Sequence, residues 1–292
     1  MNHNSPTFVA SLIKELDSTK FNKEVYDKTG LFVVRNAIPK GLMDEWKGEW
    51  DAFYDKALAD SDVTTNKSYQ VGAPTKPVAL RAPLPEKLAY LYKNDHILDV
   101  AEQVFGKHIA ILNHRFIIKY KSKPGTSQIV ASIDASTVSS HVAMFLHHDY
   151  CYHVGYHNKA SFFVPITYSG KKNGTVTFYP GTHKYGYLGD VGEIDPSQFE
   201  DAWPEVTPEL EPGDFAIMHS LLWHRSCANE DGTERIVADI IYQPADDPSG
   251  RQLARGEWQT DVFVRHENRT NYLKTSRVKT IAELREKLRA RE

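Results

Sequence analysis

The hydrophobic pattern of the chain changes near residue 108, and this change restricts the folds that the sequence can adopt. From that point on, short runs rich in β-branched and aromatic residues alternate with turns marked by Gly, Pro and Asn. These runs cover residues 108–120, 141–149, 160–167, 175–180, 214–220 and 235–243. Short strands separated in this way predict a closed or double-sheet β architecture.

The part before residue 108 is predicted to be mostly helical. Ser5-Pro6 is a helix start signal, and apolar residues follow it at helical spacing. Leu42, Trp46 and Trp50 fall on one face of a second, long helix. Two more helices are expected over 85–93 and 96–106, and one short strand over 31–35.

We expect one domain over residues 1–292, with a helical part over about 1–107, a β core over about 108–245 and a C-terminal extension over about 246–292. A capping box at Thr280 and Glu283 predicts a last helix in that extension. The formal net charge of -3 gives no reason to expect nucleic acid as a partner. No apolar run approaches the ~18 residues that a transmembrane helix needs.

The two cysteines and the N-terminal residues indicate the cellular compartment in which the protein is expected. Cys151 and Cys227 are far apart and form no CxxC pattern, so we interpret them as reduced thiols in a cytoplasmic protein. A single structural disulfide is the alternative. The N-terminus has neither the basic start nor the apolar core of a secretory signal.

Residues 145–157 are rich in histidine and contain the tripeptide His147-His148-Asp149. In a strand, residues i and i+2 share a face roughly 6.6 Å apart, so His147 and Asp149 point together while His148 points away. Two histidines and one carboxylate mark non-haem Fe(II) sites. The third ligand has to come from elsewhere, and segment 211–243 offers His219 and His224, with His219 alternatively a core position of a strand.

Several motifs then occur in a fixed order along the chain. The HxD tripeptide is followed by "NGTVTFYPGTH" at 173–183, by "PGDF" at 212–215, and by "HRSCAN" at 224–229 with Arg235 beyond it. This pattern over about residues 110–243 resembles the phytanoyl-CoA dioxygenase family of Fe(II)/2-oxoglutarate oxygenases. The resemblance implies a mainly β fold with flanking helices, namely a double-stranded β-helix of the jelly-roll, cupin-like kind.

The resemblance also implies a site and its cofactors. His147, Asp149 and His224 would bind Fe(II), Arg235 would grip the distal carboxylate of 2-oxoglutarate, and Ser226 would add a hydroxyl donor. Arginine suits that carboxylate because its guanidinium donates two parallel charge-assisted hydrogen bonds. O2 is the third reactant, and ascorbate is an optional reductant. The family also uses a polar residue of the upstream strand, for which the candidates are Asn113, Lys119 and Tyr120.

The expected reaction is hydroxylation of a C–H bond in a small substrate, because related halogenases have Gly or Ala where this chain has Asp149. Segments 61–83 and 122–140 are the expected selectivity elements, and Lys67, Lys76 and Arg81 suggest an anionic substrate. Candidates are a sugar acid such as the Kdo unit of lipopolysaccharide, a phosphonate or an acyl-CoA-like ester. Two alternatives are a cupin-like metal-binding or sensor protein without turnover and a zinc hydrolase.

The remaining histidines are expected to have roles other than metal binding. His148 is expected to be packed or hydrogen-bonded, and His183 to shape its own turn. His141, His153 and His157 are expected at the pocket mouth or on the surface. The sequence gives no oligomeric state.

Overall fold

The computed structural model describes residues 6–59, 79–80, 86–107, 109–119, 146–149, 159–185, 203–244 and 252–253. Within these ranges the helices are α1 (Pro6–Leu16), α2 (Lys23–Thr29), α3 (Lys40–Ala59), α4 (Glu86–Tyr90) and α5 (Asp95–Phe105), with 3-10 turns η2 (Leu91–Lys93) and η4 (Thr182–Tyr185). The helices predicted from periodicity before residue 108 are therefore confirmed.

Helix α2 was not predicted, because its seven residues are too few to show an apolar period. Its ends carry the signal instead. The side chain of Asn22 accepts a hydrogen bond from the backbone N–H of Val25 at the start. Gly30 ends the helix in the left-handed conformation, with φ of 73°.

The strands are β1 (Asp17–Ser18), β2 (Leu31–Val34), β3 (Ala79–Leu80), β4 (Ile109–Lys119), β5 (Ala160–Pro165), β6 (Val176–Phe178), β7 (Phe215–His219), β8 (His224–Ser226), β9 (Arg235–Pro244) and β10 (Gln252–Leu253). The large sheet has the order β1-β2-β7-β5-β9-β4-β10, and β3 also pairs with β4. Strands β6 and β8 form a separate antiparallel pair.

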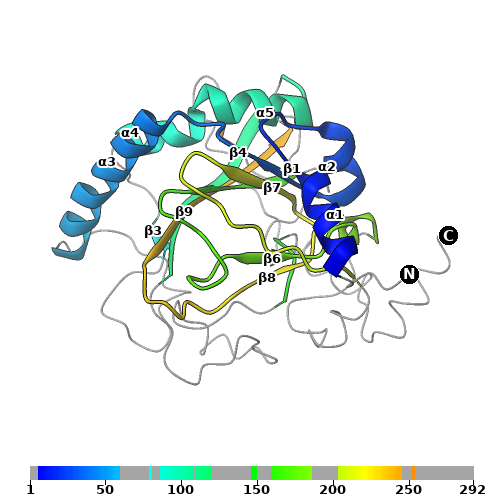
Figure 1. Ribbon diagram of the computed structural model, residues 1–292. Coiled ribbons are helices and arrows are strands. Elements are labelled where there is room, and N and C mark those ends of the chain that lie inside the picture. The colour runs from blue at the N-terminus through cyan, green and yellow to red at the C-terminus, as the bar shows by residue number, and fades with distance from the viewer. Residues whose placement is uncertain are drawn as a thin grey trace, which may run out of the picture.

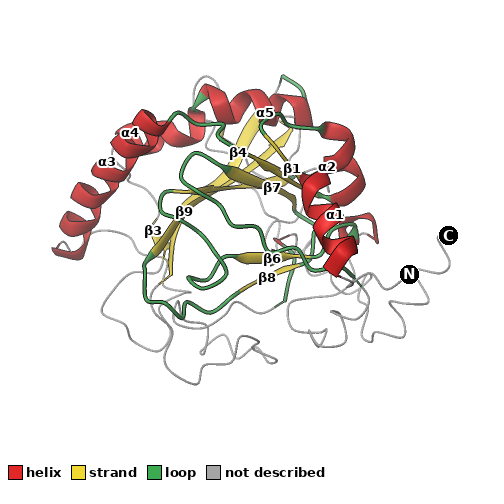
Figure 2. Cartoon of the chain, in the orientation of Figure 1, coloured by secondary structure: helices red, strands yellow, loops and turns green. Residues whose placement is uncertain are grey.

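The two sheets and the helices form layers. Figure 1 shows α3, α4 and α5 arched over one side of the large sheet, while β6 and β8 lie on its other side. Figure 2 shows the helices confined to the outside of this arrangement. One apolar core therefore lies between helices and sheet, where Trp50 of α3 meets Phe116 of β4 at a ring distance of 4.7 Å.

A second core lies on the opposite face of the large sheet. Alternate side chains of β5 point into the two cores. Phe162 belongs to the core under the helices and Phe163 to the core that includes β6. The face of β5 that carries Ser161 and Phe163 is therefore the face turned toward the small sheet.

The expected strand 141–149 is only partly described and is not a regular strand where it is. Leu146 to Asp149 contain an isolated bridge at His147 and a 3-10 residue at Asp149. Strand β8 was also missed, because its three polar residues carry no strand pattern. Segment 122–140, most of 61–83 and the predicted last helix lie outside the described residues.

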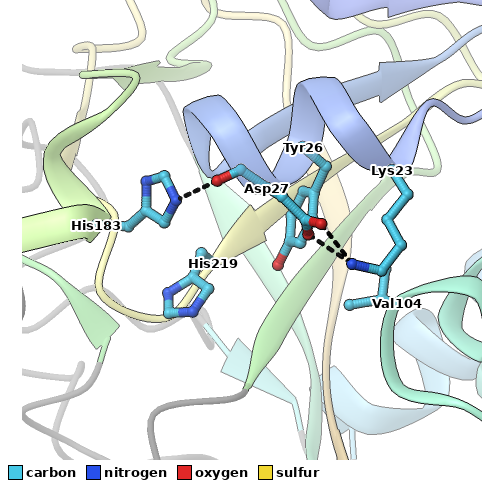
Figure 3. Close-up of a pocket in the computed structure, with 6 residues that line it drawn as sticks. All are labelled: Lys23, Tyr26, Asp27, Val104, His183 and His219. Atoms are coloured by element: carbon cyan, nitrogen blue, oxygen red, sulfur yellow. Dashed lines mark hydrogen bonds and ion pairs between the residues drawn. The ribbon is translucent and has the colours of Figure 1, made fainter.

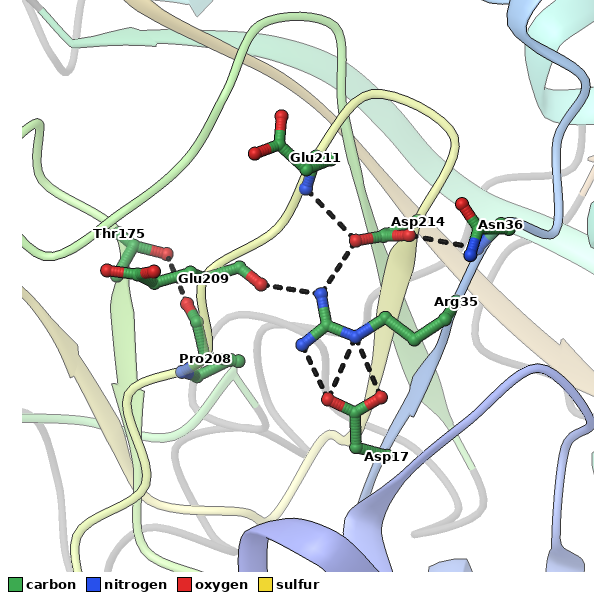
Figure 4. Close-up of polar contacts among 8 residues, drawn as sticks. All are labelled: Asp17, Arg35, Asn36, Thr175, Pro208, Glu209, Glu211 and Asp214. Carbon is green, nitrogen blue, oxygen red and sulfur yellow. Dashed lines mark hydrogen bonds and ion pairs between the residues drawn. The ribbon is translucent and has the colours of Figure 1, made fainter.

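Asp214 of the "PGD" turn belongs to a polar cluster that connects the N-terminal part of the chain to the sheet (Figure 4). Asp214 accepts hydrogen bonds from the guanidinium of Arg35 at 2.6 Å and from the backbone N–H of Asn36 at 2.9 Å. Arg35 also donates to both carboxylate oxygens of Asp17 and to the carbonyl of Glu209. None of the helices in the described ranges is long and apolar enough to cross a membrane.

Candidate metal centre

Two segments that are far apart in the sequence meet at the candidate metal centre. His147 and His224 face each other in an antiparallel bridge, in which each backbone N–H donates to the carbonyl of the other residue, at 2.9 and 2.8 Å. This bridge fixes the two imidazoles on neighbouring stretches of backbone. Their ring centroids lie 4.2 Å apart.

Asp149 completes a group of three. Its Oδ1 lies 3.7 Å from Nε2 of His147 and 3.7 Å from Nε2 of His224. The three ligand atoms all fall within 4.8 Å of one another, and all three residues are buried. Two neutral imidazoles and one carboxylate are the donor set of mononuclear non-haem iron sites, so these residues fit such an ion.

Neighbouring groups orient these side chains. Nδ1 of His224 lies 2.9 Å from the carbonyl of Leu222, so this nitrogen carries the proton and Nε2 presents its lone pair. The other carboxylate oxygen of Asp149, Oδ2, accepts a hydrogen bond of 2.9 Å from the hydroxyl of Ser161 on β5. Ser161 had no signal in the sequence.

A pair of buried basic side chains lies beside this group, at the end of the paired strands β4 and β9. Lys119 and Arg235 are register partners there, and both are buried. Lys119 donates to Oγ of Ser226 at 2.7 Å and to the carbonyl of Cys227. Since His224 and Ser226 lie on one face of β8, Lys119 contacts the face of β8 that also carries His224.

Arg235 is only partly hydrogen-bonded. Its Nη1 donates to the carbonyl of Gly174 at 2.6 Å, and its guanidinium lies 5.5 Å from the ring centroid of Phe163. Its buried Nε has no hydrogen-bond partner among the described residues. Burial lowers the pKa of Arg235 to about 10, so the side chain stays cationic at neutral pH. Burial, and then the charge of Arg235, lower the pKa of Lys119.

The asparagines of the sequence motifs build turns rather than contact the metal group. Asn173 accepts from the backbone N–H of Gly170, and Asn229 accepts from that of Gly232 and donates to the carbonyl of Lys119. The two asparagines face each other in a further bridge next to β6 and β8. They hold the small sheet in place.

His148 and His183 lie away from the metal group. The ring of His148 packs edge-on against Trp223 at 4.9 Å. Nε2 of His183 lies 3.1 Å from the carbonyl of Asp27, and its ring leaves no room for a Cβ at Gly30. The Pro-Gly-Thr-His turn is thereby seated on the end of α2.

His219 ends β7 and is half-buried rather than a core residue. Its ring lies 5.2 Å from that of His183, and both line a pocket of about 240 Å³ against α2 and α5 (Figure 3). It is not part of the metal group.

Other residues from the sequence lie outside the description. These are Tyr120, His141, His153, His157, Cys151, Lys67, Lys76 and Arg81. Only the backbone of Asn113 is described. Lys119 is thus the one upstream candidate whose described side chain reaches Ser226.

The chain is similar to a known protein family and to several solved structures. The family model described as Phytanoyl-CoA dioxygenase (PhyH) matches residues 26–237. The crystal structure of the epimerase SnoN in complex with Fe3+, alpha ketoglutarate and nogalamycin RO is 16% identical, with coverage of 90% of this chain and 98% of that chain and a TM-score of 0.57.

Two further solved structures are similar. EctD from S. alaskensis with 2-oxoglutarate and 5-hydroxyectoine is 18% identical, covering 78% of this chain and 77% of that chain, with a TM-score of 0.59. The ThoJ–Ni complex, a non-heme monooxygenase, is 16% identical over 91% of this chain and 98% of that chain, with a TM-score of 0.56. At these identities the likeness establishes the fold, and the expected double-stranded β-helix with flanking helices is confirmed.

Proposed function

Because the chain belongs to the phytanoyl-CoA dioxygenase family, it is an Fe(II)/2-oxoglutarate-dependent oxygenase, and we propose that His147, Asp149 and His224 are the ligands of its iron. Their donor types, their burial and the mutual approach of their ligand atoms support this assignment. Three protein ligands would leave coordination positions on the ion for other reactants.

We assign the distal carboxylate of 2-oxoglutarate to Arg235, Lys119 and the hydroxyl of Ser226. The observation that carries this assignment is the buried cation pair, in which Nε of Arg235 has no hydrogen-bond partner among the described residues. Two buried like charges are costly unless an anion joins them. A carboxylate can accept two parallel hydrogen bonds from the guanidinium.

Bound iron and 2-oxoglutarate supply the oxidising chemistry, in which O2 is consumed, succinate and CO2 are released and a C–H bond of the substrate is hydroxylated. The chain's own residues supply position. Arg235 and Lys119 fix one end of the cosubstrate, and Phe163 covers the guanidinium and excludes water from it. The proton on Nδ1 of His224 keeps its Nε2 free to bind the ion.

The proposed substrate is a small molecule with an anionic group, such as a sugar acid like Kdo of lipopolysaccharide, a phosphonate or an acyl-CoA-like ester. A further buried lysine supports this class. Lys159 is fully buried directly before β5, and strand alternation places it on the face that carries Ser161 and Phe163. Pro165 at the other end of β5 pairs with Val237, two residues after Arg235, so Lys159 lies on the side of Ser161 away from Arg235. A substrate anion near Lys159 would therefore be separated from the cosubstrate.

Succinate release tests both the cosubstrate assignment and the proposed substrate class. With Fe(II), 2-oxoglutarate and ascorbate, we expect slow release without substrate and faster release with one class of anionic metabolite. Lys159→Met should lose the stimulation by that metabolite and retain the slow release. Stimulation by neutral or cationic compounds alone would contradict the substrate class, and absence of all 2-oxoglutarate-dependent release would contradict the cosubstrate assignment.

The same assay separates the alternatives. A metal-binding sensor or a zinc hydrolase would need the three ligands but not a buried pair of cations beside them. A hydrolase would also act without O2 and retain activity with Zn(II). The Lys119–Arg235 pair favours the oxygenase.

A further inference from the structure

The hydroxyl of Ser161 divides the two oxygens of the Asp149 carboxylate between different partners. Oδ2 accepts the Ser161 hydrogen bond at 2.9 Å, while Oδ1 lies 3.7 Å from both imidazole Nε2 atoms. Ser161 is fully buried and Asp149 is nearly so. Because the acceptor is charged, this hydrogen bond is stronger than one between neutral groups.

Ser161 is held where it can do this by the middle of the large sheet. Strand β5 pairs with β7 on one side and β9 on the other, and Ser161 is opposite Met218 and Ile241. Its neighbour Phe162 is anchored in the core under the helices, with its ring 4.9 Å from that of Tyr242. The position of the serine hydroxyl is therefore set by the sheet, whereas Asp149 lies in a segment that is not a regular strand.

We propose that Ser161 is a positioning residue that restricts Asp149 to metal binding through one oxygen and thereby keeps a coordination position for the cosubstrate. The inference rests on the proposed function. Carboxylates bind metal ions through one oxygen or through two. An Asp149 bound through both oxygens would take a fourth position on the ion, and 2-oxoglutarate, which needs two positions, would have to displace it before O2 could bind.

Removing the hydroxyl separates this role from simple support of Asp149. In Ser161→Ala the buried Oδ2 loses the hydrogen bond from Ser161, and a bound metal ion can then approach this oxygen as well. Affinity for the metal should then stay equal or rise, while affinity for 2-oxoglutarate at saturating metal should fall by about 10-fold or more, the scale of one charge-assisted hydrogen bond. A purely structural role predicts weaker metal binding and unchanged cosubstrate binding once metal is saturating.

The experiment is a pair of anaerobic titrations. Fe(II) affinity is measured first, by competition with a chelator, and 2-oxoglutarate affinity is then measured at saturating Fe(II) from the visible charge-transfer absorption of the chelate. Ser161→Thr retains a hydroxyl and should stay within about 3-fold of the parent protein for both, a difference smaller than one net hydrogen bond. Ser169→Ala is the matched control, since Ser169 is as buried but bonds to Thr175 instead.

Two results would overturn the inference. One is unchanged 2-oxoglutarate affinity in Ser161→Ala at saturating Fe(II), and the other is a loss of metal affinity that accounts for the whole effect. Failure of the proposed function looks different, because the parent protein itself would then give no absorption band with Fe(II) and 2-oxoglutarate.

Discussion

At the scale of single residues, Arg235 is the group whose removal should separate the two cofactors. Arg235→Ala deletes a guanidinium that touches none of the three proposed metal ligands in the contacts described for it. Fe(II) affinity should remain within about 3-fold of that of the parent protein. The 2-oxoglutarate concentration for half-maximal succinate release should rise about 100-fold, because two charge-assisted hydrogen bonds in a buried site are lost. Parallel loss of iron would contradict the assignment.

Lys119 makes the pH dependence of cosubstrate binding predictable in sign. Burial and Arg235 lower its pKa below the ordinary lysine value of about 10.4. An anion binds the protonated form better, so 2-oxoglutarate affinity should be highest below the lowered pKa of the free protein and fall as pH rises through it. Anaerobic 2-oxoglutarate titrations across pH test this.

The control for that profile is Lys119→Met, which keeps most of the length of the side chain and removes the charge. Its 2-oxoglutarate affinity should be about 10-fold weaker at neutral pH, equivalent to one charge-assisted hydrogen bond. It should also lack the decline that the parent protein has on the alkaline side. A decline of equal size in both proteins would place the titrating group elsewhere.

At the scale of elements, Gly174 in the turn before β6 shapes the proposed cosubstrate site. Gly174 has φ of 90°, and a Cβ there would overlap the side chain of Lys119. Gly174→Ala should displace Lys119 and weaken 2-oxoglutarate binding about 10-fold, and also cost about 1–2 kcal/mol of stability because of the positive φ.

Gly181 provides the control for Gly174, because its φ is 93° but a Cβ there would meet nothing within 4 Å. Gly181→Ala should show a similar loss in the free energy of unfolding, measured with denaturant, without the loss of cosubstrate affinity. Equal effects of both substitutions on 2-oxoglutarate affinity would mean that backbone strain, rather than contact with Lys119, is responsible.

The elements also indicate where sequence reasoning succeeds. Strands β5, β7 and β9 were predictable because they are long runs of apolar residues, and α3 because its tryptophans repeat at helical spacing. Strand β8 was not, since its three residues, His224 to Ser226, are polar and carry no strand pattern. The sequence motifs identified His224 where the strand pattern could not.

The site itself was predictable in part. Alternation suggested that His147 and Asp149 point together, and the structure brings them together although the segment is not a regular strand. The choice of Lys119 over its neighbours depends on which side chain reaches Ser226, and the role of Ser161 depends on an oxygen 12 residues away. Such contacts are set by the register of the sheet, which periodicity does not give.

At the scale of the whole molecule, Arg35 connects the N-terminal part to the rest of the fold. Burial opposes its charge, but hydrogen bonds from Arg35 to Asp17 and Asp214 raise the pKa of the guanidinium above its ordinary value. Arg35→Met would leave the buried Asp214 carboxylate without this cation. We expect a loss of about 2–3 kcal/mol in the free energy of unfolding.

Denaturant unfolding measures that loss, with Lys40→Met as the control. The ion pair of Lys40 with Asp44 is largely exposed, so its removal should change stability by less than about 0.5 kcal/mol. Similar stability of the two variants would contradict the view that the Arg35 cluster holds the parts of the fold together.

Iron binding by the intact protein tests the central claim most directly. Fe(II) is titrated anaerobically into the parent protein, Asp149→Ala and His148→Ala, and bound iron is counted per chain. We expect one iron in the parent protein and none in Asp149→Ala. His148→Ala should also bind one iron, because the His148 ring packs against Trp223. Retention of stoichiometric iron by Asp149→Ala, or its loss from a folded His148→Ala, would contradict the account.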